Sequence, residues 1–341
     1  MKTSVALCTY NGATHIRHQL TSIVGQSVLP DELIVNDDRS SDGTVDVVRE
    51  VARSAPFNVR ITVHESNLGS TLNFADAIRQ CSGDVIFLAD QDDEWHPQKI
   101  EHLLPHLADP SVGLVFTDAL LVDADLRPLG TGLWEALRLT PAEHTLLREG
   151  RPFEALLKRN LVTGATAAFR SDLRDLILPL PDGLGRIHDG WIALICSATS
   201  RVVALDEPTI SYRQHAAQQL GAPLRLKSSA AGRSLAPLGS ATSSEVTAEL
   251  QVLQDDLLCL VDRLDDPGIA ARYPTVPRAL ALAQDVVGHT QLRLALPGPW
   301  HRRVPAVVRE LRTGRYGRYS NGVRSALKDM SGLHLARVAR R

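Results

Sequence analysis

Short apolar runs alternate with amphipathic stretches through the first part of this 341-residue chain. The run Val85–Ala89 is uninterrupted, which is typical of a strand buried on both faces of a parallel sheet. Strands are expected at residues 4–8, 33–36, 59–63, 85–89 and 112–116. Between them, hydrophobic residues recur at helical spacing. These repeated units predict an α/β fold with a mostly parallel, doubly wound sheet and helices on both of its faces.

Three carboxylates follow the central apolar run directly: Asp90, Asp92 and Asp93. They stand where the strand leaves the sheet, and this carboxyl edge is where open α/β sheets place ligands. Acids packed so closely repel one another unless a cation offsets their charge, and hard oxygen ligands favour Mg²⁺ or Mn²⁺. The cluster predicts a divalent metal that carries phosphates. The alternative is an acidic turn that caps the next helix, since Pro97 suits a first helical position.

Two further polar loops are expected at the same edge of the sheet, at residues 9–12 and 36–44. A nucleotide can lie across them while the metal holds its phosphates. The chain has no GxxxxGK[ST] segment and no GxGxxG after its first strand, which excludes the P-loop and dinucleotide-binding classes. The metal is therefore expected to neutralise the diphosphate.

Composition and charge add little to this interpretation. The chain is 44% hydrophobic and 22% charged with a formal net charge of −2, which is ordinary for a soluble globular protein. Its four cysteines are widely spaced, so neither a zinc site nor a disulfide framework is indicated. A strand-like start without a secretory signal, and the lack of an apolar run long enough to cross a bilayer, predict a cytoplasmic protein.

Three ordered motifs resemble those of the family 2 glycosyltransferases of GT-A fold. They are a first nucleotide loop, a DDxSxDGT-like segment and a DQDDxW form of the metal motif, at residues 8–12 (CTYNG), 36–44 (NDDRSSDGT) and 89–95 (ADQDDEW). Asn36 and Arg39 depart from the usual apolar residue and the usual Gly of the second motif, and we interpret both as tolerated variation. The resemblance implies a GT-A fold over about two thirds of the chain.

The resemblance also implies roles for individual residues. Asp38 would hydrogen-bond the base, Asp90 the ribose or the metal, and Asp92 the metal. The remaining nucleotide-binding residues are expected in the loops after the first and third strands: Thr9, Tyr10, Asn11 and Asn67.

The acceptor side is expected at two later segments. Small residues around Gly164 let a substrate approach the backbone, or else form a tightly packed strand. Asp189 begins an apolar helix, where a carboxylate can act as general base or merely cap the helix; the resemblance favours the base, because inverting members carry it here. His188 would orient Asp189 or only pack, and Trp191 would stack on a sugar or lie in the core.

The segment YRQH at residues 212–215 resembles the end of the catalytic domain in members that transfer deoxyhexoses such as rhamnose. By that resemblance His215 completes the metal shell and Arg213 contacts the diphosphate, because Arg suits phosphate oxygens. The alternative is a solvent-exposed Arg and His pair.

We expect three parts: a catalytic domain at 1–220, a flexible linker or lid at 221–244, and a helical region at 245–341 that packs as a core or mediates an oligomer. Residues 300–341 hold ten Arg and one Lys against Glu310 and Asp329. This basic tail is expected to rest peripherally on an anionic membrane surface, the alternative being a solvated helical face. No nucleic-acid-reading module accompanies the charges.

Together these features predict an inverting, metal-dependent glycosyltransferase of surface polysaccharide biosynthesis. Its donor would be a dTDP- or UDP-linked sugar, with rhamnose favoured by the resemblance, and its acceptor a glycan hydroxyl, including lipid-linked glycans. One alternative is a non-catalytic sugar-nucleotide-binding scaffold. The other is a sugar-nucleotide pyrophosphorylase, which would normally present a Gly-rich loop near its first strand.

Overall fold

The structure is a computed structural model that describes residues 1–331 except 182, 184, 186, 216–242 and 298. The chain divides into two compact units. The first comprises residues 1–156, 160–182 and 186–225, and the second 157–159, 183–185 and 226–341. Almost all of the predicted linker at 221–244 lies outside the described residues, so the domain bounds expected from the sequence stay a prediction.

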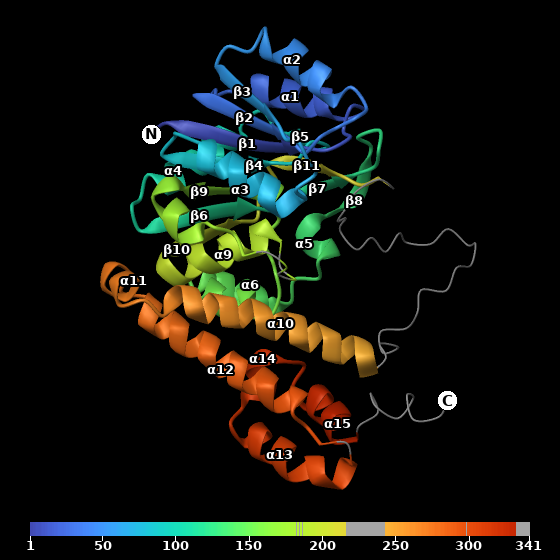
Figure 1. The fold of residues 1–341 in the computed structure, drawn as a ribbon, viewed down its shortest axis with the longest axis vertical. Helices are drawn as coiled ribbons and strands as arrows, with labels where there is room; N and C mark the ends of the chain where they lie inside the picture. The colour runs from blue at the N-terminus through green and yellow to red at the C-terminus, as the bar shows by residue number, and fades with distance from the viewer. Residues whose placement is uncertain (182, 184, 186, 216–242, 298, 332–341) are drawn as a thin grey trace, which may run out of the picture. The chain divides into compact units, whose positions relative to one another are not determined.

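The first unit is built on a sheet of seven strands in its described part (Figure 1). Six strands are parallel, and β9 runs antiparallel between β4 and β6. Their spatial order is β10 (Arg201–Leu205), β6 (Val112–Thr117), β9 (Ala167–Arg170), β4 (Val85–Ala89), β1 (Thr3–Thr9), β2 (Glu32–Asp37) and β3 (Asn58–Val63). The mostly parallel α/β sheet predicted from the apolar runs is confirmed.

Helices cover both faces of this sheet because alternate residues of its strands point to opposite sides. Val5, Leu7 and Phe87 share one core cluster with helices α1 (Ile16–Val24), α2 (Thr44–Ala52) and α4 (Lys99–Leu107). On β1 and β2 packs α3 (Ser70–Gln80), which also contacts α9 (His188–Thr199). Every residue of β1 and β4 is buried, as strands covered on both faces require.

A second, four-stranded sheet stands beside the main one in the described residues of this unit. Its order is β5 (Glu94–Trp95), β11 (Ile210–Arg213), β7 (Leu120–Val122) and β8 (Pro128–Gly132). It pairs the end of the metal loop with the strand before His215. Short helices complete the unit: α5 (Leu133–Ala136), α6 (Pro141–Arg148), α7 (Pro152–Leu156), α8 (Arg174–Ile177) and the 3₁₀ turns η1 (Gly164–Thr166) and η2 (Ser171–Leu173).

The second unit is helical in its described part. Its helices are α10 (Ser243–Leu264), α11 (Pro267–Arg272), α12 (Val276–Leu294), α13 (Trp300–Arg312), α14 (Arg315–Tyr319) and α15 (Val323–Ser331). Leu257, Leu260 and Leu264 of α10 are fully buried, and α10 packs along α12. No helix in the described residues is both long enough and apolar enough to cross a bilayer.

Candidate active site

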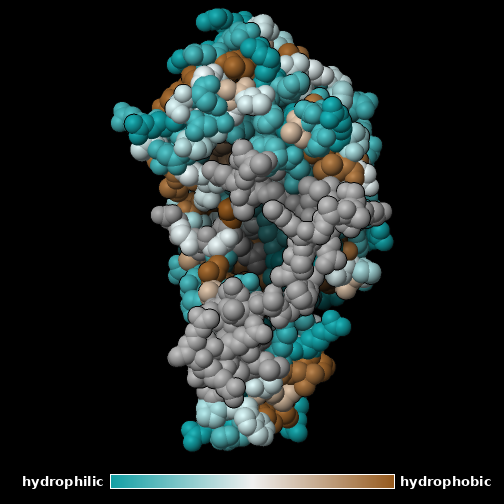
Figure 2. All heavy atoms as spheres, turned by 90° about the vertical axis from the view of Figure 1, so that its right-hand side faces the viewer, coloured by the Kyte–Doolittle hydropathy of each residue, from teal (hydrophilic) through white to brown (hydrophobic). Residues whose placement is uncertain are grey.

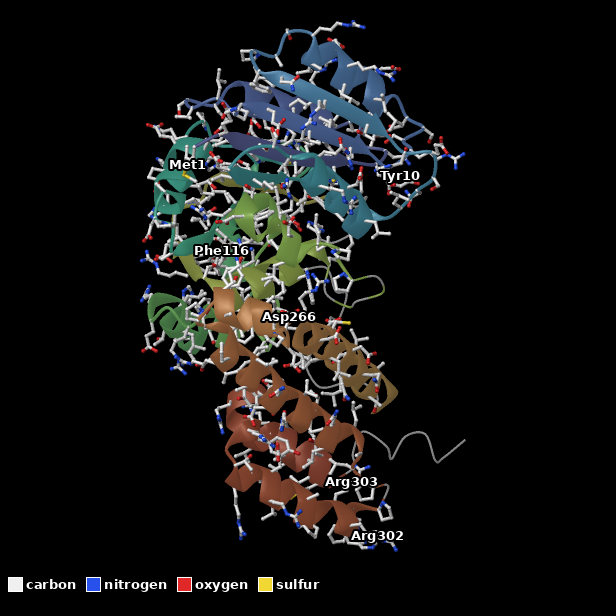
Figure 3. The ribbon with its side chains drawn as sticks, turned by 60° about the vertical axis from the view of Figure 1, so that its left-hand side comes forward. Met1, Tyr10, Phe116, Asp266, Arg302 and Arg303 are labelled. Carbon is white, nitrogen blue, oxygen red and sulfur yellow. The ribbon has the colours of Figure 1, made fainter. Side chains whose placement is uncertain are left out.

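Three polar loops lie side by side because their strands are neighbours. Thr9 ends β1, Asp37 ends β2 and Ala89 ends β4, and the parallel register pairs Thr9 with Asp37 and Leu7 with Ala89. Tyr10 is seen just beyond the end of β1 in Figure 3. The structure thus brings together the loops at 9–12, 36–44 and 90–94 that the sequence placed at one edge.

The first loop is bonded to both of its neighbours. Buried Thr9 donates through Oγ1 to Asp37 Oδ2 at 2.7 Å. The backbone of Tyr10 donates to Gln91 Oε1 at 2.8 Å and accepts from Gln91 Nε2 at 3.0 Å, and the residue is 40% exposed. Asn11 Oδ1 accepts from Ser41 N at 2.9 Å. Of the predicted nucleotide residues in this loop, Thr9 is buried, whereas Tyr10 and Asn11 are exposed.

Gln91 is a residue that the sequence reasoning passed over, although it lies inside the metal motif. A Cβ on Gly12 would lie 2.1 Å from Gln91 Oε1, so only glycine leaves room for the Gln91 amide between the two loops. Gly12, which ends the first loop, is the feature of the sequence that could have pointed to this contact with Gln91.

Asp38 connects the second loop to the loop that follows β3. Its Oδ1 accepts from Leu68 N at 2.6 Å and its Oδ2 accepts from Gly69 N at 2.9 Å, while Asn67 Nδ2 donates to the Asp38 carbonyl at 3.2 Å. The predicted residues Asp38 and Asn67 therefore meet. Each carboxylate oxygen of Asp38 accepts a hydrogen bond from one backbone N–H group. These bonds hold the loop after β3 beside Asp38, where we expect the base of the nucleotide.

The metal loop meets the end of β11. His215 Nε2 lies 2.8 Å from Asp92 Oδ2, and the His15 ring centroid lies 4.6 Å from that of His215. Asp90 lies two residues earlier on the same loop. Burial, followed by repulsion from Asp92 and Asp189, raises the pKa of the Asp90 carboxyl to about 7. This acidic crowding is what a divalent cation would offset.

Asp93 and Arg213 join the metal loop to β11 by hydrogen bonds. Asp93 is fully buried, and its Oδ1 accepts from Arg213 N at 3.0 Å. Burial, then Asp92 and Asp90, raise the pKa of Asp93 well above its usual range. The Arg213 side chain is 2% exposed and donates to the carbonyls of Asp92 and Ala124. The sequence offered two interpretations of Arg213. Exposure to solvent is wrong, because the residue is buried. Contact with the diphosphate stays a prediction.

Asp189 lies in the first turn of α9, and two groups of the acceptor segment donate hydrogen bonds to it. Asn160 Nδ2 donates to its Oδ1 at 2.9 Å and Gly164 N donates to its Oδ2 at 3.1 Å. Both donors favour the ionised carboxylate. A Cβ on Gly164 would lie 3.1 Å from His188 Nε2, so the close approach predicted at this glycine is made by a side chain of the protein. Asn160 carried no signal in the sequence.

His188 and Trp191 are packing residues, as the alternative interpretations had them. The His188 ring stacks on Phe74 with centroids 3.9 Å apart, and burial lowers its pKa to about 3. Trp191 is 1% exposed and donates through Nε1 to the Ile177 carbonyl at 3.0 Å. A sugar-stacking wall at Trp191 is wrong, because the indole lies in the core.

Lys99 is a second residue that the sequence reasoning missed. Its ammonium is fully buried, lies 3.8 Å from the centroid of the Trp95 ring and donates to the Ala165 carbonyl. Burial lowers its pKa to about 7, while Asp93 and Asp90 oppose the shift. One cation thus sits between the acidic loop and the segment that carries Gly164.

The donor set suits a metal that arrives with phosphates. Within the described residues no three His, Cys, Asp or Glu side chains form a metal-ligating cluster. Asp92 and His215 together supply an oxygen and an imidazole nitrogen, and Asp90 adds a nearby carboxylate. Mg²⁺ and similar ions are commonly held by one or two carboxylates plus substrate phosphates, so these residues fit such an ion.

The family model of glycosyl transferase family 2 matches residues 4–175. The chain belongs to this family. An uncharacterised glycosyltransferase of Nostoc sp. is 23% identical over 64% of this chain and 66% of its own length. An O-antigen chain rhamnosyltransferase of Salmonella typhimurium is 26% identical over 57% of this chain and 60% of its own. The match thus spans about two thirds or less of the length of these relatives.

Solved structures of glycosyltransferases share the fold. Residues 1–349 of S. aureus TarS, in complex with UDP-GlcNAc, superpose with a TM-score of 0.54 at 15% identity, covering 99% of this chain and 92% of that one. A mannosyltransferase from Pyrobaculum calidifontis, in complex with GDP-Man and Mn²⁺, gives 0.50 at 19% identity, covering 99% and 86%. The expected GT-A fold with a helical C-terminal region is confirmed.

Proposed function

We propose that this family 2 member is an inverting, metal-dependent glycosyltransferase. The observation that carries the proposal is the meeting of Asp92 with His215 at the edge where the three loops lie, with Asp189 close enough to raise the pKa of Asp90. A bound Mg²⁺ or Mn²⁺ would stabilise the departing diphosphate as a Lewis acid. Asp92 and His215 would hold that ion together with phosphate oxygens of the donor, with Asp90 two residues earlier on the same loop.

Asp189 acts as the general base in this proposal. Its carboxylate takes the proton of an acceptor hydroxyl, the freed oxygen bonds to the anomeric carbon of the donor sugar, and the bond from that carbon to the diphosphate oxygen breaks. One displacement inverts the anomeric configuration. Asn160 and Gly164 orient the carboxylate, and the site acts mainly by alignment and charge.

The donor and acceptor are proposed from the relatives. A dTDP-rhamnosyl transferase of Shigella flexneri is 31% identical over 29% of this chain and 35% of its own length, which supports a dTDP-rhamnose donor over a UDP-sugar. A putative teichuronic acid biosynthesis glycosyltransferase of Bacillus subtilis is 29% identical over 37% of this chain and 50% of its own. With the O-antigen enzyme, it supports a glycan acceptor in surface polysaccharide biosynthesis.

Calorimetric titration tests the donor site. We expect dTDP-rhamnose to bind only with Mn²⁺ present, and Asp92→Ala to weaken binding at least tenfold. The exposed carboxylate of Asp109 supplies the matched control, because Asp109→Ala removes an equal charge just before β6, at the sheet edge opposite to the metal loop. Failure of the wild-type chain to bind any nucleotide sugar, with or without metal, would sink the transferase proposal and favour a scaffold.

A further inference from the structure

The last three helices carry a surface of cations with no acidic counterpart. Within residues 300–331 the two acidic side chains, Glu310 and Asp329, are 2% and 6% exposed. Glu310 lies 2.8 Å from His289 Nδ1, and Asp329 lies 2.8 Å from Arg293 Nε. Both acids are therefore used inside the helical unit and leave the outer charge of this segment positive.

Five cations of the segment are exposed and form no ion pair within the part of the chain that the structure describes: Arg302, Arg309, Arg312, Arg324 and Lys328. On α13 the three arginines recur at i, i+7 and i+10, which places them on one face of the helix. Buried Val307 and Glu310 mark the opposite face. Figure 3 shows Arg302 at the end of the helical unit.

Apolar side chains stand beside these cations. Trp300, which begins α13, is 64% exposed, and Val323 and Leu327 of α15 are 64% and 56% exposed. Val323 and Leu327 are one helical turn apart, as are Arg324 and Lys328, so α15 presents an apolar row next to a cationic row. The two helices pack on each other. Figure 2 shows hydrophobic side chains next to hydrophilic ones at the surface of this part of the unit.

The opposite charge is found elsewhere in the same unit. Helix α10 and the turn after it expose acids: Glu249, Asp255, Asp262, Asp265 and Asp266. The cationic surface is therefore a local feature of α13 to α15, while the whole chain has a formal net charge of −2.

We propose that α13 to α15 form a docking surface for an anionic phospholipid membrane. Arginine and lysine attract anionic headgroups, while Trp300, Val323 and Leu327 enter the boundary between headgroups and acyl chains. Nucleic acid would use the same charges but would gain little from aliphatic side chains, which lack a π-face for stacking on bases. The exposed apolar row therefore favours lipid.

Co-sedimentation of the full chain with vesicles tests this surface, without donor, so that the result is separate from the nucleotide titration. We expect binding to vesicles of phosphatidylcholine with phosphatidylglycerol, and little to phosphatidylcholine alone. Raising the salt from about 0.1 M to about 1 M shortens the Debye length from about 10 Å to about 3 Å and should release the protein. Equal binding to both vesicles would overturn the proposal.

Charge reversal identifies the residues. Each cation near an anionic surface changes partitioning about fivefold, so Arg302→Glu, Arg309→Glu and Arg312→Glu together should lower vesicle binding at least about 100-fold. The control reverses three exposed cations of the first unit, Lys2, Arg49 and Arg53, and should leave binding within about threefold of wild type.

Circular dichroism would reveal misfolding of the α13 variant. Two variants of α15 test the same surface independently. Arg324→Glu with Lys328→Glu should weaken binding on its own, and Leu327→Ser should weaken it without changing its salt dependence. Wild-type binding by the α13 variant, or binding to duplex DNA with vesicles ignored, would overturn the lipid surface.

Discussion

Asp189 is held by groups from two segments that lie before it in the chain. Asn160 and the backbone of Gly164 each donate to one of its oxygens, and the carboxylate is 6% exposed. Asp189→Asn keeps the shape of the side chain but removes the base, and its amide nitrogen cannot accept one of these two hydrogen bonds. We expect kcat to fall about 100- to 10,000-fold while the dissociation constant of the donor changes little. Steady-state kinetics and donor titration measure the two quantities separately.

Asn160→Ala is the companion variant, because it removes one donor to the base and leaves the base itself in place. A smaller loss of kcat is expected, because the base remains but loses one of the two groups that orient it. Activity of Asp189→Asn within tenfold of wild type would remove Asp189 from the reaction.

His188 makes stability depend on pH. Burial lowers its pKa to about 3 from 6.5, so between these values the unfolded chain binds a proton that the folded protein does not. The contribution of neutral His188 to the free energy of unfolding is complete above pH 6.5. It is lost as the pH falls toward 3, by up to about 1.4 kcal/mol per pH unit. Between pH 7 and 4.5, His188→Asn should lose roughly 2–3 kcal/mol less stability than wild type in urea unfolding.

The exposed His18 supplies the control for this titration. His18→Asn should leave the loss of stability between pH 7 and 4.5 unchanged. If His188→Asn showed the same loss as wild type, the imidazole would not be the group that couples folding to protonation.

At the scale of elements, strand β11 of the second sheet holds the metal loop through hydrogen bonds of Arg213. Arg213 lies on β11, and its buried guanidinium donates to the carbonyls of Asp92 and Ala124, which lie on two different loops. Arg213→Met leaves both carbonyls without this donor, at about 1–3 kcal/mol each. We expect a loss of roughly 2–6 kcal/mol in the free energy of unfolding, measured by urea denaturation.

Arg127 is the matched control, because its side chain is 75% exposed in an ion pair with Asp125. Arg127→Met should change stability by less than about 0.5 kcal/mol. Should Arg213→Met keep full stability yet lose affinity for the diphosphate, Arg213 would contact the ligand as the sequence suggested.

For the molecule as a whole, the two compact units differ in what they contribute. The first carries the three loops, the acidic cluster and Asp189. The second carries the helices and the cationic surface of α13 to α15. Neither charge pattern shows in the formal net charge of −2, since acids and bases cancel over the chain.

The sequence by itself determined the layers of the first unit and the edge where its loops meet. Continuous apolar runs report burial on both faces, and the carboxyl ends of neighbouring parallel strands meet at one edge. The order of three motifs then indicated the family. These signals are local in the chain or repeat at a fixed period, so no knowledge of packing was needed to interpret them.

Only the tertiary structure decided which side chains meet at that edge. Arg213 and Asp92 lie 121 positions apart, and nothing in either segment says that one holds the other's backbone. The same holds for three other contacts, which also join residues distant in the chain: Lys99 with Ala165, Gln91 with Tyr10, and Asn160 with Asp189. Periodicity gives the direction in which a side chain points, but its partner depends on how distant elements pack, because buried polar groups must find donors and acceptors wherever the fold brings them.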